Sequence, residues 1–307
     1  MNTTHYDRIF ITGYSSFIGS HVFSLLKDSG MAGQVILLGR KPQALASASW
    51  KYLDLTEPQP AGLPYNGRNL LIHYAAQLPG SISVDYKKLF DSEAEFLERC
   101  RIMQITDIVY ASTGGVYGYS GSRRESDPPH PEDPYSVYKL AIEENVTCLW
   151  PRNHLILRYF FPFGAGQGIP RLIPGLIHKL MGNETIRIAG ESHGLTLNPV
   201  YIADAAEASA WLIRNNLHGI YNIAGRHRLT LLELVQQLSS GLNRTPKLEY
   251  SNEQDREMTG SADKVLSMHS GLLSTPWNEA IRRTVTTYFD PSVPLSEGVA
   301  RDEAMEK

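Results

Sequence analysis

Short apolar runs alternate with amphipathic segments along roughly the first 160 residues of the chain. Six runs have the length and composition of buried strands: 8–11, 34–38, 50–53, 69–73, 107–111 and 154–158. Helical periodicity fills the gaps between them, most clearly at 18–28, 86–103 and 136–150. Apolar strands that alternate with helices predict a parallel sheet covered on both faces, with right-handed connections. The expected fold class is therefore α/β, with a doubly wound parallel sheet.

The pattern changes after about residue 160. Glycine and proline become frequent, and the predicted elements shorten. We therefore expect residues 1–160 to form the main domain, and residues 161–288 to form a smaller substrate-binding part that is interleaved with it. The terminal segment, 289–307, is polar and charged, and we expect it to be disordered.

Composition limits the classes of function. The chain has 307 residues and a net charge of −3 without a run of Lys or Arg, so neither nucleic acid nor an anionic membrane is an expected partner. No apolar stretch approaches the ~20 residues that span a bilayer, and the polar N-terminus does not resemble a signal peptide. Cys100 and Cys148 lie in predicted helices without metal-ligand spacing. We expect a cytoplasmic protein with reduced, packed cysteines and no metal.

A glycine-containing turn lies between the first strand and the first helix. Gly13 and Gly19 occupy the first and last positions of Gly-x-x-Gly-x-x-Gly, and Ser16 replaces the middle glycine but can still offer its amide and hydroxyl to a phosphate. Such a turn lets a pyrophosphate approach the backbone amides at a helix N-terminus, where the dipole favours an anion. A merely tight turn before a capped helix is the alternative. The residues expected to bind the dinucleotide here are Gly13, Ser15, Ser16, Phe17, Ile18 and Gly19.

Residues after the next three strands bear on the kind of dinucleotide. A carboxylate after the second strand would bind the ribose 2′-hydroxyl of NAD and repel the 2′-phosphate of NADP. This chain has Arg40 there, which can pair with the phosphate, so the sequence favours NADP slightly over NAD. A solvated loop cation is the alternative. Asp54, beside Leu55, can accept from the adenine amino group, and Ala75 and Ala76 are small enough to let the dinucleotide pass.

Tyr135 and Lys139 are spaced to lie on the same face of a helix. An ammonium beside a buried phenol favours the phenolate, which lowers the tyrosine pKa and makes an acid/base that works near neutral pH. The spacing alone is common, and a solvated pair is the alternative. Thr113 follows the fifth strand, at the sheet edge where open α/β sheets bind ligands, and can donate to a substrate oxygen. A hydroxyl that is satisfied within its own loop is the alternative for Thr113.

In this order the motifs resemble those of the extended short-chain dehydrogenase/reductase family, of the NAD-dependent epimerase/dehydratase type that modifies nucleotide sugars. The resemblance covers about residues 8–288 and rests on the segments 12–19, 71–76, 109–118, 134–139, 157–165, 198–204 and 219–225. It implies a Rossmann-type fold, bound NAD(P), and hydride transfer at a sugar carbon, usually C4. It also implies that Thr113 orients the substrate, that Tyr135 is the acid/base, and that Lys139 binds the nicotinamide ribose and lowers the Tyr135 pKa.

Several positions depart from the family pattern. Phe161 stands where the family often has an Asn that contacts the substrate diphosphate, and Leu197 stands where an Arg is common. Arg256 can supply a phosphate-pairing cation, with a surface ion pair as the alternative. The helix at 86–103 lacks the Asn that relatives use as a supporting catalytic residue. The residues expected to contact the substrate are Gly114, Gly115, Phe161 and Arg256.

Gly114 and Gly115 also bear on the type of reaction. A 4,6-dehydratase of this family places an acid and a base just after the threonine, and two glycines can do neither job, which argues against a dehydratase. The sequence favours an epimerase of a nucleotide sugar. An NADPH-dependent 4-ketoreductase, a reductase of a non-nucleotide substrate and a non-catalytic dinucleotide sensor stay open.

Family members commonly form dimers through two helices, which correspond to 86–103 and 136–150 in this chain. Four apolar residues would form the contact faces of such a homodimer: Phe90, Leu97, Val146 and Leu149. The same residues could instead belong to the core.

Overall fold

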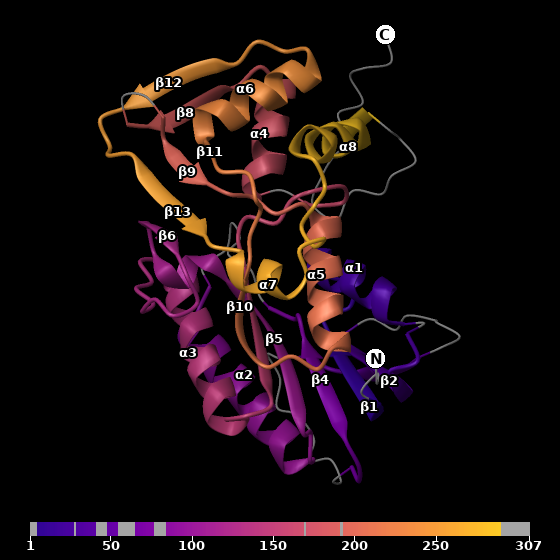
Figure 1. The fold of residues 1–307 in the computed structure, drawn as a ribbon. Coiled ribbons are helices and arrows are strands. Elements are labelled where there is room, and N and C mark those ends of the chain that lie inside the picture. Colours follow the sequence, from indigo (N-terminus) through magenta and orange to yellow (C-terminus); the bar gives the residue numbers. More distant parts are fainter. Residues whose placement is uncertain are drawn as a thin grey trace.

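The computed structural model describes residues 5–27, 29–40, 48–54, 65–76, 84–168, 170–190 and 193–289. It is built around a seven-stranded parallel sheet in the order β10-β7-β5-β4-β1-β2-β3 (Figure 1). The strands are β1 (Tyr6–Thr12), β2 (Ala32–Gly39), β3 (Ser49–Tyr52), β4 (Asn69–His73), β5 (Asp107–Thr113), β7 (His154–Tyr159) and β10 (Gly219–Ile223). All six strands predicted from the apolar runs are present, which confirms the α/β fold.

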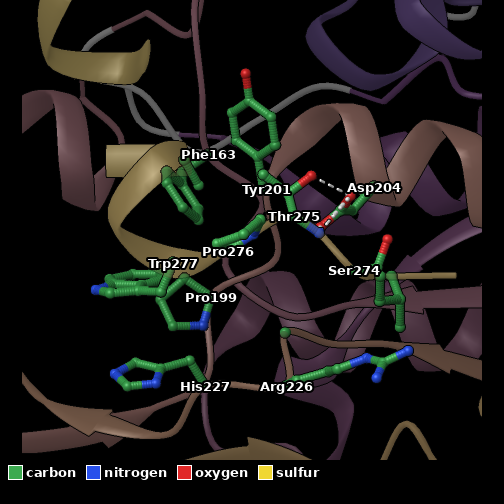
Figure 2. Close-up of a pocket in the computed structure, with 13 residues that line it drawn as sticks. Phe163, Pro199, Tyr201, Asp204, Arg226, His227, Ser274, Thr275, Pro276 and Trp277 are labelled. Atoms are coloured by element: carbon green, nitrogen blue, oxygen red, sulfur yellow. Dashed lines mark hydrogen bonds between the residues drawn. The ribbon is translucent and has the colours of Figure 1, made fainter. Parts of the chain in front are cut away.

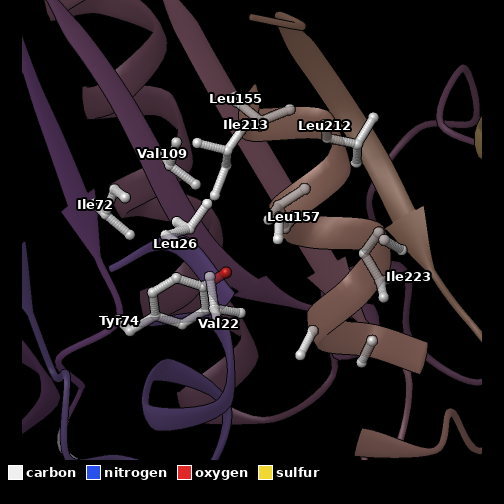
Figure 3. Packing of buried hydrophobic residues seen from close by; sticks show 14 of the residues in the cluster. Val22, Leu26, Ile72, Tyr74, Val109, Leu155, Leu157, Leu212, Ile213 and Ile223 are labelled. Atoms are coloured by element: carbon white, nitrogen blue, oxygen red, sulfur yellow. The ribbon is translucent and has the colours of Figure 1, made fainter. Parts of the chain in front are cut away.

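Each face of this sheet is covered by two helices. They are α1 (Phe17–Leu26) and α5 (Ile202–Arg214) on one face, and α2 (Tyr86–Ile102) and α3 (Pro134–Leu149) on the other. Side chains alternate between the faces, as the pleat of a strand requires. On β4, Leu70 and Ile72 belong to the core beneath α1 and α5, whereas Leu71 belongs to the core beneath α2 and α3. Figure 3 shows the first of these cores, where Leu26 and Leu212 approach the sheet from the two helices.

The order of the strands reverses between β1 and β4, because the chain first builds outward to β3 and then returns to the other side of β1. Open α/β sheets bind ligands at the carboxyl ends of the strands beside such a reversal. Thr12 at the end of β1 pairs with His73 at the end of β4. The glycine-containing turn follows Thr12 directly and therefore lies at this point.

The smaller part is built from two short sheets and four helices. The four-stranded sheet contains β11 (Leu229–Thr230), β9 (Leu195–Leu197), β13 (Arg256–Gly260) and β6 (Ser120–Arg123), and the two-stranded sheet contains β12 (Lys247–Ser251) and β8 (Thr185–Ala189). The helices are α4 (Leu172–Met181), α6 (Leu231–Leu242), α7 (Asp263–Met268) and α8 (Trp277–Phe289). A separate apolar core, which includes Ile177 of α4 and Leu238 of α6, holds most of this part together.

The chain crosses between the two parts more than once. β6, from the first half of the sequence, pairs with β13 in the four-stranded sheet. Conversely, β10 comes from the second half of the sequence but pairs with β7 in the large sheet, and α5 packs against that sheet. The sequence pattern does not predict β10, because Asn222 interrupts its short apolar run. In the structure Asn222 is fully buried and accepts a hydrogen bond from the Tyr117 hydroxyl at 3.1 Å, so a polar residue is tolerated in a buried position of this edge strand.

Three further findings bear on the sequence predictions. Cys100 is buried but Cys148 is exposed, so the expectation that both are packed is wrong for Cys148; neither is in a disulfide. Leu97 and Val146 are fully buried and belong to the core rather than to a dimer face. Among the described residues, no helix combines the length and apolarity that crossing a membrane requires. The predicted disordered segment, 289–307, lies outside the described residues apart from its first residue.

Candidate active site

The turn between β1 and α1 is pressed against the end of β4. Gly13 has φ +64°, and a Cβ added there would lie 2.4 Å from the backbone nitrogen of Ala75. A Cβ added at Gly19 would lie 2.2 Å from the carbonyl oxygen of Gly13. Both positions therefore require glycine, one for its conformation and both for the close approach of the backbone. The turn leaves the N-terminus of α1 at the carboxyl edge of the sheet.

Ser16 caps α1. Its Oγ accepts a hydrogen bond from the amide of Gly19 at 3.2 Å, and its own amide donates to the carbonyl of Gly13 at 2.9 Å. The expectation that the Ser16 amide can bind a phosphate is therefore wrong, because that amide is used within the turn. The hydroxyl proton remains able to donate. Phe17 and Ile18 provide the first helical amides, which have no carbonyl acceptor one turn earlier in the helix, and Ser15 is exposed beside them.

The other residues predicted to bind the dinucleotide come from neighbouring strand ends. Arg40 is exposed after β2, and Asp54 is half-buried after β3. Ala75 and Ala76 are half-buried after β4, and the amide of Ala75 donates to Thr12 Oγ1 at 3.2 Å. Leu55 lies outside the described residues. Since β4, β1, β2 and β3 are adjacent in this order, these predicted residues share one edge of the sheet.

Thr113 ends β5 and begins the 3-10 turn Gly114–Tyr117. Its Oγ1 accepts from the amide of Gly115 at 3.1 Å, so the Thr113 hydroxyl proton is left to donate elsewhere. A Cβ at Gly114 would lie 2.5 Å from the ring of Phe160, and one at Gly115 would lie 2.3 Å from Ser136 Oγ and 3.4 Å from Thr113 Oγ1. Gly115 therefore brings the end of β5 against the first turn of α3, and neither glycine position has room for a side chain.

Helix α3 begins at Pro134, two residues before the predicted start at residue 136. Asp133 is the N-cap and accepts from the amide of Ser136 at 3.0 Å, and Pro134 occupies the first turn, where its missing N–H costs nothing. This start places Tyr135 in the first turn, half-buried, and Lys139 one turn later at 1% exposure. Lys139 Nζ lies 4.0 Å from the centre of the Tyr110 ring, which is a cation–π contact. Among the described residues, none makes a hydrogen bond with this ammonium.

The pKa values of the pair differ from the expectation. Burial raises the pKa of Tyr135 to about 12; Arg171 acts in the opposite direction, and Glu93 adds to the increase. In the protein alone, burial therefore outweighs the positive charge of Arg171, so the pKa of Tyr135 is raised rather than lowered. The lowering of this pKa by Lys139 stays a prediction. Burial also lowers the pKa of Lys139 to about 8, against the charges of Glu93 and Glu143, which raise it.

A buried network of charged and polar groups lies beneath this pair, and it was not predicted. His73 Nδ1 lies 2.6 Å from Thr12 Oγ1, and His73 Nε2 lies 3.1 Å from Glu93 Oε1. The Tyr138 hydroxyl donates to the other oxygen of Glu93. The sequence could have indicated that Glu93 is buried. It lies three residues before Phe96 and four before Leu97, and this spacing places it on the apolar face of the helix.

A second buried carboxylate, Glu143, lies one turn after Lys139 on α3. It accepts from Arg158 Nε at 3.0 Å and from the Ser112 hydroxyl. Arg158, in turn, lies over the Tyr117 ring with its guanidinium carbon 4.6 Å from the ring centre. The Arg158–Glu143 ion pair is therefore satisfied within the core by charge, by hydrogen bonds and by an aromatic face.

Apart from the two glycines, the residues predicted to contact the substrate lie toward the smaller part of the molecule. Phe161 has φ +43°, a conformation that non-glycine residues rarely adopt, and its half-buried side chain packs against the core of the smaller part. Arg256 is exposed, lies 3.9 Å from Glu132 and has its guanidinium carbon 4.8 Å from the centre of the Tyr119 ring. These contacts fit the surface ion pair that was the alternative for Arg256.

A separate pocket of about 310 Å³ lies where α5 and α8 begin (Figure 2). Several of its polar side chains are bonded within the protein: Asp204 accepts from the Thr275 hydroxyl at 2.6 Å, and Arg226 donates to the carbonyl of Leu272 at 2.6 Å. His227 stacks on Trp277 at 5.1 Å across the same wall. None of the predicted catalytic residues lines this pocket, so it does not identify the chemistry.

The sequence and the fold are similar to those of known proteins. The NAD dependent epimerase/dehydratase family profile matches residues 9–224. The chain is 26% identical over 326 residues to an uncharacterized UDP-glucose epimerase of Bacillus subtilis strain 168, which covers 97% of each chain. It is 25% identical over 262 residues to a UDP-glucose 4-epimerase of Streptomyces lividans, which covers 75% of this chain and 79% of that relative.

A likeness in fold extends over nearly the whole molecule. The structure of a Thermus thermophilus UDP-glucose 4-epimerase in complex with NAD superposes with a TM-score of 0.75 at 22% identity, over 92% of this chain and 99% of that one. The family profile covers well over half of the chain and includes the glycine-containing turn, Thr113, Tyr135 and Lys139. The protein therefore belongs to the NAD-dependent epimerase/dehydratase family.

Proposed function

We propose that the protein is a NAD-dependent epimerase that inverts a sugar carbon, C4, of a nucleotide sugar. The observation that carries the proposal is the state of Lys139, a buried ammonium with no hydrogen-bond acceptor among the described residues, one turn from Tyr135. A buried charge without acceptors is costly unless a ligand supplies them. The hydroxyls of a nicotinamide ribose are acceptors of the right kind. The names of the relatives support the same reaction class.

The residues around the sheet edge fit a dinucleotide. The close-packed Gly13 and Gly19 leave the amides of Phe17 and Ile18 for the pyrophosphate, and Asp54 is the candidate partner for adenine. NAD supplies, when bound, a hydride acceptor and a positively charged ring that favours the Tyr135 phenolate. A related enzyme was solved with NAD, which supports NAD as the cofactor. The slight preference for NADP drawn from Arg40 stays a prediction, to be tested by comparing the two affinities.

Tyr135 and Thr113 act on the substrate oxygen in this proposal. With a pKa of about 12, Tyr135 holds its proton at neutral pH and is a donor to a keto oxygen. It becomes a base only when further positive charge lies near it, and Arg171 already acts in this direction. The Thr113 hydroxyl, whose oxygen is engaged by Gly115, can donate to the same substrate oxygen and orient it.

A dehydratase is disfavoured by the glycines after Thr113. Their added Cβ atoms would collide with Phe160 and with Ser136, so an acid and a base cannot be accommodated there without moving the backbone. A ketoreductase that uses NADPH would need the same three residues as an epimerase. The two reactions differ in whether the cofactor is consumed.

The reaction class is tested with a panel of nucleotide sugars. Redox-neutral conversion of UDP- and GDP-sugars is followed by NMR, and NADH or NADPH oxidation is followed with nucleotide 4-keto sugars. We expect conversion without net change of cofactor, and a loss of about 10²–10⁴-fold in Tyr135→Phe but not in Tyr250→Phe, an exposed tyrosine. Stoichiometric NADPH consumption would establish the ketoreductase instead. No turnover with cofactor bound would favour a sensor or a non-nucleotide substrate.

A reductase of a non-nucleotide substrate is the second candidate, because Phe161 removes a polar contact and Arg256 is engaged with Glu132. Asn tolerates the positive φ of position 161 and adds an amide that can donate to a diphosphate. If the substrate is a nucleotide sugar, Phe161→Asn should lower its KM at least about tenfold, since a hydrogen bond to a charged group is worth about 1.5–3 kcal/mol. Phe161→Leu, which adds no donor, is the control. A Phe161→Asn variant without this gain would leave the non-nucleotide substrate as the better candidate.

A homodimer through α2 and α3 also remains a proposal. The large apolar residues exposed on these helices are Ile102, at 70%, and Val137, at 51%. They replace Leu97 and Val146 as candidates for the contact between the two copies. Sedimentation of the wild type and of Val137→Lys measures whether each protein is a dimer, and so tests this contact.

A further inference from the structure

Glu93 is a buried carboxylate that the proposed reaction does not use. It lies in the middle of α2 and is 2% exposed. A buried carboxylate destabilises the fold unless charge and hydrogen bonds compensate it. Burial acts to raise the pKa of Glu93, but the hydrogen bond and the charge interaction with His73, the charge of Lys139 and the hydrogen bond from Tyr138 outweigh it, so the pKa is lowered. The carboxylate is therefore ionised at neutral pH.

Glu93 is connected to the turn at the sheet edge through two side chains. Thr12 Oγ1 accepts from the amide of Ala75, and its proton is left to donate to His73 Nδ1 at 2.6 Å. On the other side of the ring, His73 Nε2 lies 3.1 Å from Glu93 Oε1, where a proton on Nε2 donates to the carboxylate. Every polar atom of this chain of hydrogen bonds has a partner in that arrangement. Thr12 directly precedes Gly13, so the hydrogen bonds lead to the glycine-containing turn.

Two buried carboxylates act on Lys139. The titratable groups of this cluster are Glu93 of α2, Tyr135, Tyr138 and Glu143 of α3, Tyr110 of β5, His73 of β4 and Arg158 of β7. Arg158 neutralises Glu143 through a direct ion pair at 2.5 Å. Glu93 is bonded by the His73 imidazole and by the Tyr138 hydroxyl. Both carboxylates act to raise the pKa of Lys139, and Glu93 has the larger effect of the two.

We propose that Glu93 is a positioning residue of the active site, whose buried negative charge keeps the Lys139 ammonium protonated for binding of the nicotinamide ribose. The helix that lacks the family's supporting Asn contributes this carboxylate instead. The role rests on the proposed function, because it takes Lys139 as the residue that holds the cofactor. Glu93 acts on Lys139 through the electric field and through Tyr138, which bonds Glu93 and whose ring centre lies 5.9 Å from Lys139 Nζ.

The role has a direct consequence for pH dependence. Lys139 is charged below its pKa, which burial lowers to about 8 while Glu93 acts to raise it. The affinity for cofactor should therefore fall as the pH rises through about 8. Without the charge of Glu93 the midpoint should move to lower pH by about one unit or more. Near neutral pH the neutral lysine loses the charge-assisted part of its hydrogen bonds, so binding should weaken by about tenfold.

The test measures the dissociation constant of NADH by fluorescence between about pH 6 and pH 9.5 in the full chain, for the wild type, Glu93→Gln and Glu93→Asp. Glu95→Gln is the matched control, because Glu95 is exposed on the same helix and pairs with Arg99. We expect the midpoint to fall in Glu93→Gln, to recover in Glu93→Asp, and to stay unchanged in Glu95→Gln. A folded Glu93→Gln protein with the wild-type midpoint would overturn the proposal.

A second measurement covers the case in which Glu93→Gln does not fold. The titration of Lys139 in the wild type is followed by NMR of ¹³C-labelled lysine, assigned with Lys139→Arg. A midpoint at or above about 7.5 supports the proposal, and a midpoint below that value overturns it, because Lys139 would then be largely neutral despite Glu93. Failure of the proposed reaction is distinguishable: shifted midpoints without any sugar turnover would reject the epimerase and leave the role of Glu93 intact.

Discussion

The two faces of the large sheet are packed differently. Beneath α1 and α5 the core is mainly apolar, with Tyr159 bonded to Tyr74 at 2.7 Å and to Ser209 at 2.7 Å. A buried carboxylate on this face, Asp107, lies at the start of β5, at the opposite end of the strand from Thr113, and pairs with Arg68 at 2.7 Å. Beneath α2 and α3 the same sheet buries two carboxylates, a lysine, an arginine and a histidine. The charged face is the one that carries Tyr135 and Lys139. The face that carries the candidate catalytic pair therefore holds more buried charged groups than the other face, and such groups are costly to bury unless they are paired.

The largest expected effect is on the charged face. Glu143→Gln removes the carboxylate that pairs with Arg158 and leaves a buried guanidinium without its counter-charge. The free energy of unfolding should fall by about 3–5 kcal/mol. Equilibrium urea unfolding measures this change, with Glu144→Gln, the exposed neighbour, as the control. A loss below about 1 kcal/mol would mean that the charged face does not depend on the pairing described above.

On the apolar face a truncation should affect stability alone. Leu212 of α5 is fully buried (Figure 3), and Leu212→Ala should lower the free energy of unfolding by about 2–5 kcal/mol through lost burial and a cavity. The dissociation constant of NADH should stay unchanged at temperatures where the variant is folded. Leu25→Ala, an exposed leucine of α1, is the control. Cofactor affinity that falls tenfold in Leu212→Ala would show that the two faces are not separate in function.

Glu93→Gln is expected to show the smallest change in stability of the three, because it removes a desolvated charge while keeping the shape and one acceptor for Tyr138 or His73. Its effect should instead appear in the pH midpoint of cofactor binding, as described above. An equal loss of stability in Glu93→Gln and Glu143→Gln, with no change of midpoint, would place both carboxylates in the same structural role.

The fold was predictable because its signals are local and periodic. The run Leu70-Leu71-Ile72 is apolar throughout, as a strand covered on both faces must be. The start of α3 was predicted two residues late, because the cap formed by Asp133 and Pro134 was not used. β10 was missed because Asn222 is polar, and the fold satisfies it with Tyr117 from a distant part of the sequence. A pattern within one segment cannot reveal a partner that only the tertiary fold supplies.

The sequence predicts residues for the candidate site but not their electrostatics. The spacing of Tyr135 and Lys139 identifies the pair, yet the sequence does not show how deeply each is buried, and burial dominates both pKa values. Ser16 illustrates the same limit, since its amide is used by Gly13 and only the folded turn reveals this. Glu93 could have been singled out as a charge on an apolar helix face, but its partners, His73 and Tyr138, lie on two other elements.

The most direct test of the central claim follows a UDP-sugar and its C4 epimer by NMR with the purified protein, while the amount of reduced cofactor is measured in the same sample. We predict that the two sugars reach equilibrium without net oxidation or reduction of cofactor, and that Tyr135→Phe abolishes the conversion while it still binds NAD. Equal rates in Tyr135→Phe and in the wild type would contradict the account, because the reaction would then not depend on the tyrosine beside Lys139.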